Sequence, residues 1–132
     1  MNIEYKILEI IELNDGNVYE IIKVRDTIFK SPKGDFEQYV VNRTDEHMEK
    51  VNDWIDKYLI PYMTRKDINY KISSYGIKHD CQGALGGEYV SDDEIKYLLA
   101  VRGIKGTNKR EEYPTNLFYQ LSSHYKKQFT KK

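Results

Sequence analysis

The sequence predicts an α+β protein: an N-terminal antiparallel β-meander of three to four strands, covered by one long helix and followed by a helix-turn-helix-like C-terminal module. Three observations carry this prediction. Residues 3–41 are rich in β-branched side chains between turn signals, and residues 45–60 carry apolar side chains at helical spacing. Residues 73–104 contain two short capped segments separated by glycines.

The first two strands are predicted on either side of residues 14–17, whose sequence is Asn-Asp-Gly-Asn. Asp15-Gly16 favours a two-residue type I′ turn, because both central positions need positive φ. Residues 18–24 are β-branched and favour a strand. This turn would place Leu13 opposite Val18 and Ile7 opposite Val24.

A second hairpin is predicted around residues 32–35, with strands at residues 27–30 and 36–41. The resulting meander needs a cover for its apolar face, since a bare sheet of this size is marginally stable.

Residues 45–60 provide that cover as a long helix. Thr44 or Asp45 can cap its N-terminus, and Pro61 weakens its last turn. Its apolar stripe contains large side chains at helical spacing, with Trp54 near the edge: Met48, Val51, Ile55, Tyr58, Leu59 and Tyr62. We expect this helix to be the main packing partner of the sheet.

After a polar connection over residues 64–69, two short helices are predicted. Ser73 or Ser74 caps the first, and Gly86-Gly87 ends it with a residue in the left-handed region. Residues 91–94 form a capping box for the second helix, which Gly103 closes. The expected buried side chains of the pair are Ile77, Cys81, Ala84 or Leu85, Ile95, Leu98 and Leu99.

The last part of the chain is predicted as a charged loop over residues 105–113 and then a helix. Pro114 suits the first turn of this helix, which would run through Leu117, Phe118, Leu121 and Tyr125. Residues 128–132 are expected to fray.

Length, composition and charge favour one domain with an uneven charge distribution. The chain has 132 residues, 39% hydrophobic and 32% charged, with a formal net charge of zero. Residues 1–60 contain 13 acidic and 8 basic side chains, whereas residues 61–132 contain 8 acidic and 13 basic. We therefore divide the chain into an acidic β-meander plus helix (1–62), a basic helical module (63–128) packed with it as one compact unit, and a frayed tail (129–132).

Several function classes are disfavoured by the residues. No run of 18 apolar residues or signal-peptide pattern is present, and the single Cys81 cannot form an internal disulfide, so we expect a cytoplasmic protein without a membrane partner. One Cys and three scattered His do not supply a structural metal site. Residues 83–87 lack the Lys-Ser/Thr of a phosphate loop. We expect no catalytic residues, metal, cofactor or small-molecule substrate.

The candidate binding residues are basic and aromatic side chains around the two-helix unit: Tyr75, Lys78, Tyr89, Lys96, Arg102, Lys105, Lys109 and Arg110. Cations attract phosphates and aromatic rings stack on exposed bases, but Tyr and Arg are also favoured in protein interfaces. A protein partner, a nucleic acid and an ordinary solvated surface therefore remain alternatives. The acidic start of the second helix, residues 92–94, argues against conventional major-groove readout.

Two motifs, Ser74-Tyr75-Gly76-Ile77-Lys78-His79 and Gly87-Glu88-Tyr89-Val90-Ser91, followed by Ile95 and Gly103-Ile104, resemble a module of small phage and mobile-element proteins from AT-rich Gram-positive hosts. The resemblance covers residues 74–104. The chain departs from the module where that module has Leu, Glu, Asn and an aromatic residue: Ile77, Gln82, Asp92 and Ile104.

Small phage proteins of this size and context include anti-CRISPR inhibitors. The resemblance therefore implies a non-enzymatic phage protein of the bacterial host cytoplasm that binds a host defence ribonucleoprotein, such as Cas9 with its guide RNA. The alternative is a small helix-turn-helix-like regulator that binds DNA or RNA.

Overall fold

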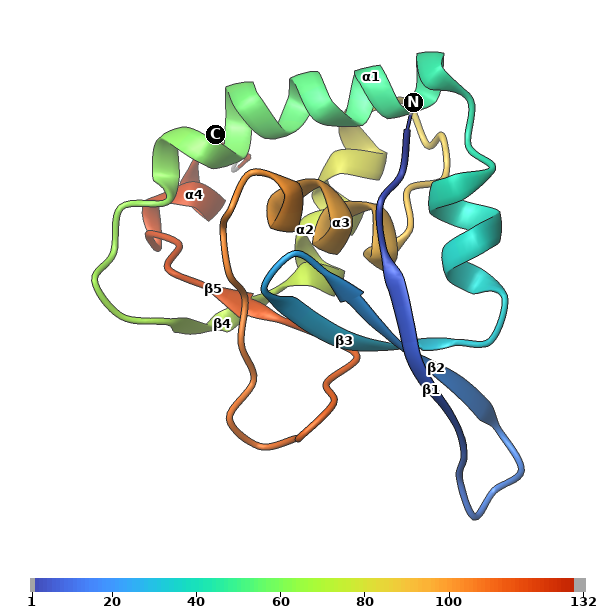
Figure 1. Ribbon diagram of the computed structural model, residues 1–132. Helices are drawn as coiled ribbons and strands as arrows, with labels where there is room; N and C mark the ends of the chain where they lie inside the picture. Colours follow the sequence, from blue (N-terminus) through green and yellow to red (C-terminus); the bar gives the residue numbers. More distant parts are fainter. Residues whose placement is uncertain (1, 130–132) are drawn as a thin grey trace.

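The computed structural model describes residues 2–129 and has an α+β fold, as predicted (Figure 1). Three strands form an antiparallel sheet in the order β1 (Lys6–Glu12), β2 (Val18–Val24), β3 (Thr27–Pro32). A second antiparallel sheet pairs β4 (Asn69–Ser73) with β5 (Phe118–Tyr119). The helical elements are η1 (Glu37–Val41), α1 (Asp45–Trp54), η2 (Ile55–Leu59), η3 (Ile60–Tyr62), α2 (Ser74–Ala84), α3 (Asp92–Val101) and α4 (His124–Lys127).

The loop of the β1–β2 hairpin begins one residue earlier than predicted. Leu13 pairs with Asn17 through a 2.9 Å hydrogen bond from the Leu13 N–H, and Gly16 has φ +88°. The loop therefore contains three residues with glycine in the left-handed position. Val18 lies opposite Glu12 instead of Leu13, and a bulge after Ile7 shifts the register again, so that Ile7 lies opposite Ile22 instead of Val24.

The predicted fourth strand, residues 36–41, is wrong. The chain leaves β3 at Pro32 and turns at Gly34, where φ is +90°, into η1, which has π-helical hydrogen bonding. Phe36 and Val40 are each 1% exposed. In the helical conformation both side chains lie on one face and pack into the core.

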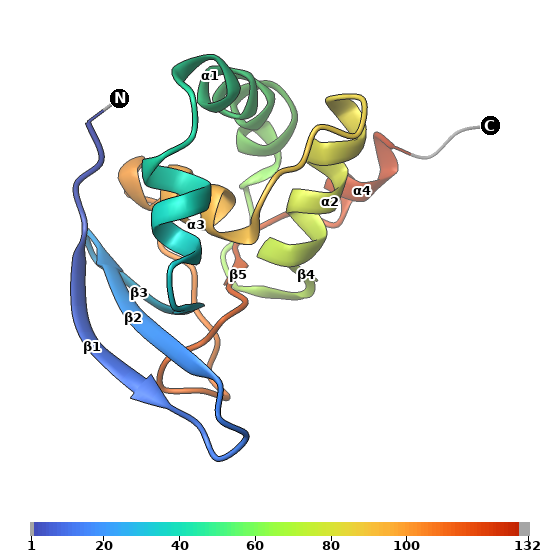
Figure 2. The same cartoon turned by 90° about the vertical axis from the view of Figure 1, so that its right-hand side faces the viewer.

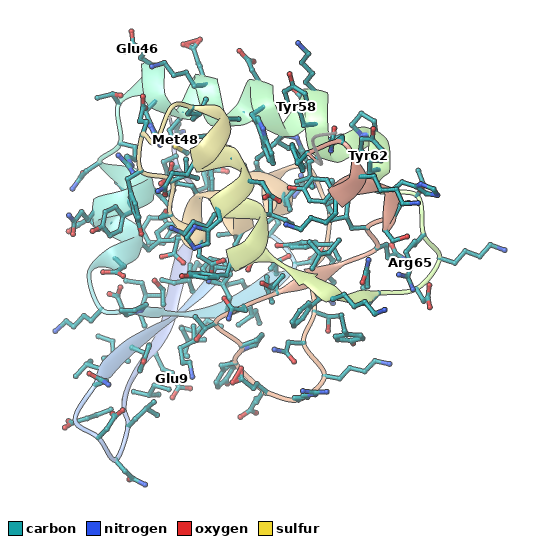
Figure 3. All side chains as sticks on the ribbon, turned by 180° about the vertical axis from the view of Figure 1, so that it is seen from behind. Glu9, Glu46, Met48, Tyr58, Tyr62 and Arg65 are labelled. Carbon is teal, nitrogen blue, oxygen red and sulfur yellow. The ribbon has the colours of Figure 1, made fainter. Side chains whose placement is uncertain are left out.

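The long helix begins where it was predicted, but it does not cover the sheet. The side chain of Thr44 accepts a 3.1 Å hydrogen bond from the His47 N–H and caps α1. Met48 is buried and Glu46 faces outward (Figure 3). α1 packs against α3, which in turn packs against β2 and η1 and lies between α1 and the sheet (Figure 1). The central packing position thus belongs to α3.

The predicted caps of α2 and α3 are confirmed. The Ser73 hydroxyl accepts from the Gly76 N–H at 3.2 Å, and the Gly87 N–H bonds to the Gln82 carbonyl at 2.9 Å after Gly86 has turned to φ +69°. A complete capping box starts α3. Most of α3 is buried, including Ile95, Leu98 and Leu99, whereas Ala84 of α2 is exposed.

The predicted connection is present over residues 64–68, but a second sheet replaces the predicted last helix. Asn69 lies opposite Tyr119 in the β4–β5 pairing. Leu117, Tyr119 and Leu121 are each at most 1% exposed, which is the alternation of a strand. The predicted helix over residues 114–125 is therefore wrong, because the apolar residues alternate as in a strand. Only the four residues of α4 are helical in this part of the chain. Residues 130–132 of the predicted frayed tail lie outside the described residues.

One apolar cluster includes side chains from both sides of the predicted division at residue 62, among them Phe29, Val51, Ile77 and Leu99. Within residues 2–129, no helix is long and apolar enough to cross a membrane.

The substitution Leu99→Ala tests the central position of α3. Leu99 is fully buried, so we expect a loss of about 2–5 kcal/mol in the free energy of unfolding, measured by urea denaturation. Leu8→Ala removes the same atoms from a side chain that is 46% exposed and should cost less than about 1 kcal/mol. Equal losses would contradict the assignment of α3 as the core helix.

Candidate partner-binding cleft

A cleft of about 180 Å³ lies where the end of β3, η1, the start of α2 and the start of α3 meet. In Figure 2 the segment from α2 to α3 runs between η1 and α2 before α3 begins. We call this feature the tyrosine–aspartate cleft. Its walls contain three tyrosines, three aspartates and no lysine or arginine: Pro32, Asp35, Tyr39, Tyr75, Tyr89, Ser91, Asp92, Asp93, Thr115 and Asn116.

The three tyrosine rings are held by cations of the protein itself. The ammonium of Lys78 lies 4.5 Å from the ring centroid of Tyr89 and 5.5 Å from that of Tyr75. The Arg43 guanidinium lies 5.6 Å from the Tyr39 ring and 5.7 Å from the Tyr89 ring. Such contacts fix ring orientation while leaving much of the ring surface in solvent. Tyr75 remains 52% exposed and Tyr89 45% exposed.

Hydrogen bonds between backbone groups and neighbouring side chains hold the segment that carries Tyr89. The Tyr89 carbonyl accepts from Arg43 Nη2 at 2.7 Å, and the Val90 N–H donates to Gln82 Oε1 at 3.2 Å. The Ser91 N–H donates to Glu94 Oε2 at 2.8 Å. The side chains of Arg43, Gln82 and Glu94 therefore fix this segment, and Tyr89 projects from a defined position.

Glu94 is the fully buried centre of an ionic network behind this segment. One of its oxygens lies 3.3 Å from Arg43 Nη2, and the other contacts His47 Nε2. The other ring nitrogen of His47 lies 2.5 Å from Glu88 Oε2. Hydrogen bonds from His47 and from Lys50 lower the pKa of the Glu88 carboxyl. Because His47 belongs to α1 and Glu94 to α3, the network ties these helices together beside the cleft.

Lys96 forms a second buried ionic group directly beneath the aspartates. Its ammonium is 2.9 Å from Asp92 Oδ2 and 3.1 Å from Asp93 Oδ1, and it donates to the Thr115 carbonyl at 2.6 Å. It also lies 4.3 Å from the Phe29 ring centroid. Burial alone would lower the pKa of Lys96, but Asp93 and Asp92 outweigh burial and raise it.

The wall residues themselves keep more negative than positive charge after this pairing, with the ammonium of Lys78 lying beside them. Asp93 also accepts a 2.5 Å hydrogen bond from the Ser31 hydroxyl, but one oxygen of Asp92, Oδ1, is buried without a hydrogen-bond donor among the described residues. Asp35 is half-buried, and burial together with the charges of Asp93 and Glu20 raises its pKa. Two carboxylates share the charge of Lys96, and the third has no ion pair within residues 2–129.

The predicted contact residues do not form one basic surface. Tyr75 and Tyr89 border the cleft, and Lys78 lies beside them but is only 5% exposed. Lys96 is 1% exposed and therefore lies in the core. Arg102 is bound to Asn52 Oδ1 at 2.7 Å and Asp56 Oδ1 at 3.0 Å, which ties the end of α3 to α1 and η2. The sequence placed Lys78 and Lys96 correctly on helices, but it did not indicate that Arg102 would bind Asn52 and Asp56 of other elements.

The remaining predicted residues, Lys105, Lys109 and Arg110, are exposed in the loop that follows α3. None of the three has an ion pair to another described residue. None of the three is a wall residue of the cleft.

Sequence reasoning missed Asp35 and Tyr39, which it assigned to a hairpin, and it assigned Asp92 and Asp93 to the capping box of a helix. One signal was present: Lys96 follows Asp92 and Asp93 by four and three residues, the spacing at which helical side chains meet.

Other chemical groups give no second site. Cys81 is fully buried, as its helical position indicated, and burial raises the pKa of its thiol to about 12. Residues 2–129 contain no group of three or more His, Cys, Asp or Glu side chains placed to hold a metal ion.

Comparison with family models, curated proteins and solved structures gives no match to this chain.

Replacing Lys96 with Met tests the buried ion pairs. The substitution leaves Asp92 and Asp93 without their cation, so we expect a loss of about 3–5 kcal/mol in the free energy of unfolding. In the control, Lys50→Met, the lysine is half-exposed and pairs with Glu88, and the loss should stay below about 1 kcal/mol. Similar losses in both variants would refute a buried role for Lys96.

Replacing Asp35 with Asn should stabilise the protein at neutral pH. The folded protein binds a proton on Asp35 more tightly than the unfolded chain does, so wild-type stability falls as the pH rises through that interval. The gain in melting temperature should shrink as the pH approaches the ordinary carboxyl value of 3.8. Asp67→Asn, at a side chain that is 79% exposed and paired with Arg65, is the control; a destabilised Asp35→Asn protein would contradict the charge excess.

Proposed function

We propose that this protein acts by binding another macromolecule, without a catalytic step, and that the tyrosine–aspartate cleft is its contact region. The observation that carries the proposal is the pair of exposed rings, Tyr75 and Tyr89, at the edge of a cleft that buried ion pairs hold in shape. Large, rigid aromatic side chains beside a pocket are the usual energetic anchors of protein interfaces.

The rigidity of the cleft supports a binding role. The Glu94 network and the Lys96 ion pairs lie directly behind the walls. The ring centroids of Tyr39 and Tyr89 are 5.3 Å apart, so these two rings also contact each other. A surface that is already ordered loses little conformational freedom on association, which favours affinity.

The proposed partner is a host CRISPR effector, a Cas9-type protein with its guide RNA, so that the chain would be a phage-type inhibitor in the bacterial cytoplasm. This part of the proposal rests on the resemblance of residues 74–104. The two motifs behind the resemblance each supply one cleft tyrosine: Tyr75 from the first and Tyr89 from the second.

An interference assay with purified effector tests the proposal. Wild-type protein should reduce target cleavage, and Tyr75→Ala or Tyr89→Ala should weaken effector binding by roughly 30-fold, the effect of losing one interface anchor. Tyr70→Ala is the matched control, because Tyr70 is 43% exposed and packs on Phe118 within the β4–β5 sheet, outside the cleft. Undiminished cleavage at saturating protein would reject the effector as the partner.

A second candidate function is nucleic-acid binding through the exposed loop that contains Lys105, Lys109 and Arg110. The buried position of α3 directs this alternative to the loop, since the second helix of the pair offers few side chains to a DNA groove.

A salt titration of binding to duplex DNA tests this alternative. The logarithm of affinity should fall with the logarithm of salt concentration, with a slope near −0.9 per phosphate neutralised. Replacing Lys105, Lys109 and Arg110 together with Gln should make the slope shallower by that amount for each lost contact. An absence of binding at low salt eliminates the nucleic-acid function.

A further inference from the structure

We infer that the tyrosine–aspartate cleft receives an arginine side chain of the partner protein. This inference rests on the proposed function and names the group that the cleft recognises. Three features support it: the charge of the walls, the aromatic rings, and the size of the space.

The charge of the walls favours a cation. Asp35, Asp92 and Asp93 face the cleft, and no wall residue is basic. Lys96 neutralises one charge of the Asp92–Asp93 pair from below, while Asp35 has no ion pair among the described residues. Lys78, beside Tyr89, offsets part of the remaining negative charge of the walls, and a bound cation would reduce it further, whereas an anion would meet three carboxylates at short range.

Asp35 gives the cation an accessible acceptor for hydrogen bonds, and Asp92 adds negative charge from a buried position. Asp92 Oδ1 is buried and receives no hydrogen bond from residues 2–129. Because this oxygen is closed to solvent, a cation in the cleft would compensate the Asp92 carboxylate by its charge and not by a direct hydrogen bond. Asp35 comes from a distant part of the sequence, the turn between β3 and η1.

The aromatic rings favour the same kind of ligand. Lys78 and Arg43 already lie within 6 Å of the ring centroids of Tyr75, Tyr39 and Tyr89, so the rings are used for cation contacts within the protein. An incoming cation would meet tyrosine at the mouth of the cleft and carboxylates at its walls.

The size of the cleft selects a side chain, and the chemistry selects arginine. A volume of about 180 Å³ is smaller than the roughly 300–1,000 Å³ of sites for small-molecule ligands and cofactors. The guanidinium group is planar, stacks on aromatic rings and donates in pairs to carboxylates, and it is less strongly hydrated than an ammonium group. These properties match a site that combines tyrosine rings with aspartates.

A peptide titration followed by two-dimensional NMR tests this inference on the full chain. The probe is acetyl-Gly-Gly-Arg-Gly-Gly-amide, and the control peptide carries citrulline, the neutral analogue of arginine. We expect the arginine peptide to shift the backbone signals of Tyr75, Tyr89, Asp92 and Asp93. The citrulline peptide should bind about fivefold more weakly, the factor expected for losing one exposed cation contact.

Two variants make the test specific to the cleft. Asp35→Asn should weaken binding of the arginine peptide while raising the melting temperature of the free protein, a combination that a purely structural role of Asp35 would not produce. Asp67→Asn should leave peptide binding unchanged, because Asp67 pairs with Arg65 in the connection before β4. Equal binding of the arginine and citrulline peptides, or shifts confined to residues outside the cleft, would overturn the inference.

The outcome separates this inference from the proposed function. If Tyr75→Ala abolishes effector binding but the arginine peptide does not shift the cleft, the proposed function stands and the arginine assignment fails. If the arginine peptide binds the cleft but the effector is not inhibited, the assignment stands and the proposed partner is wrong.

Discussion

The burial of the acidic first turn of α3 is the constraint on which the rest of this structure depends. Asp93 and Glu94 are almost inaccessible to solvent, a position that ionised carboxylates tolerate only beside cations and hydrogen-bond donors. Lys96 compensates Asp93 from within α3, and His47 compensates Glu94 from α1. A capping turn that begins as a local feature thereby becomes the point where the elements of the fold are joined.

The same arrangement shapes the cleft. The turn that is compensated from below presents Asp92 to the cleft, and the segment that leads into it presents Tyr89. Asp35 adds a carboxylate that has no cation of its own among the described residues, so the free protein carries a charge excess in this region. Surfaces that sacrifice stability in this way are typical of binding sites, where the partner supplies the missing charge.

The sequence predicted features that depend on neighbouring residues and missed those that depend on distant ones. The caps at Thr44, Ser73 and Ser91 were predicted because a cap involves residues three positions apart. The β4–β5 pairing joins residues about fifty positions apart, and no local pattern specifies it. For the same reason Tyr75 and Tyr89 were found as candidates, whereas the acidic partners that give their cleft its sign were not.

The burial of Lys96 is the most direct test of this account, and NMR of lysine ammonium groups measures it. Exposed ammonium protons exchange rapidly with water at neutral pH, whereas an ammonium enclosed by Asp92, Asp93 and the Thr115 carbonyl is protected. We predict a protected lysine ammonium signal that disappears in the Lys96→Met protein. If every lysine ammonium exchanges as fast as those on the surface, the buried ion pairs do not exist and the cleft built on them is wrong.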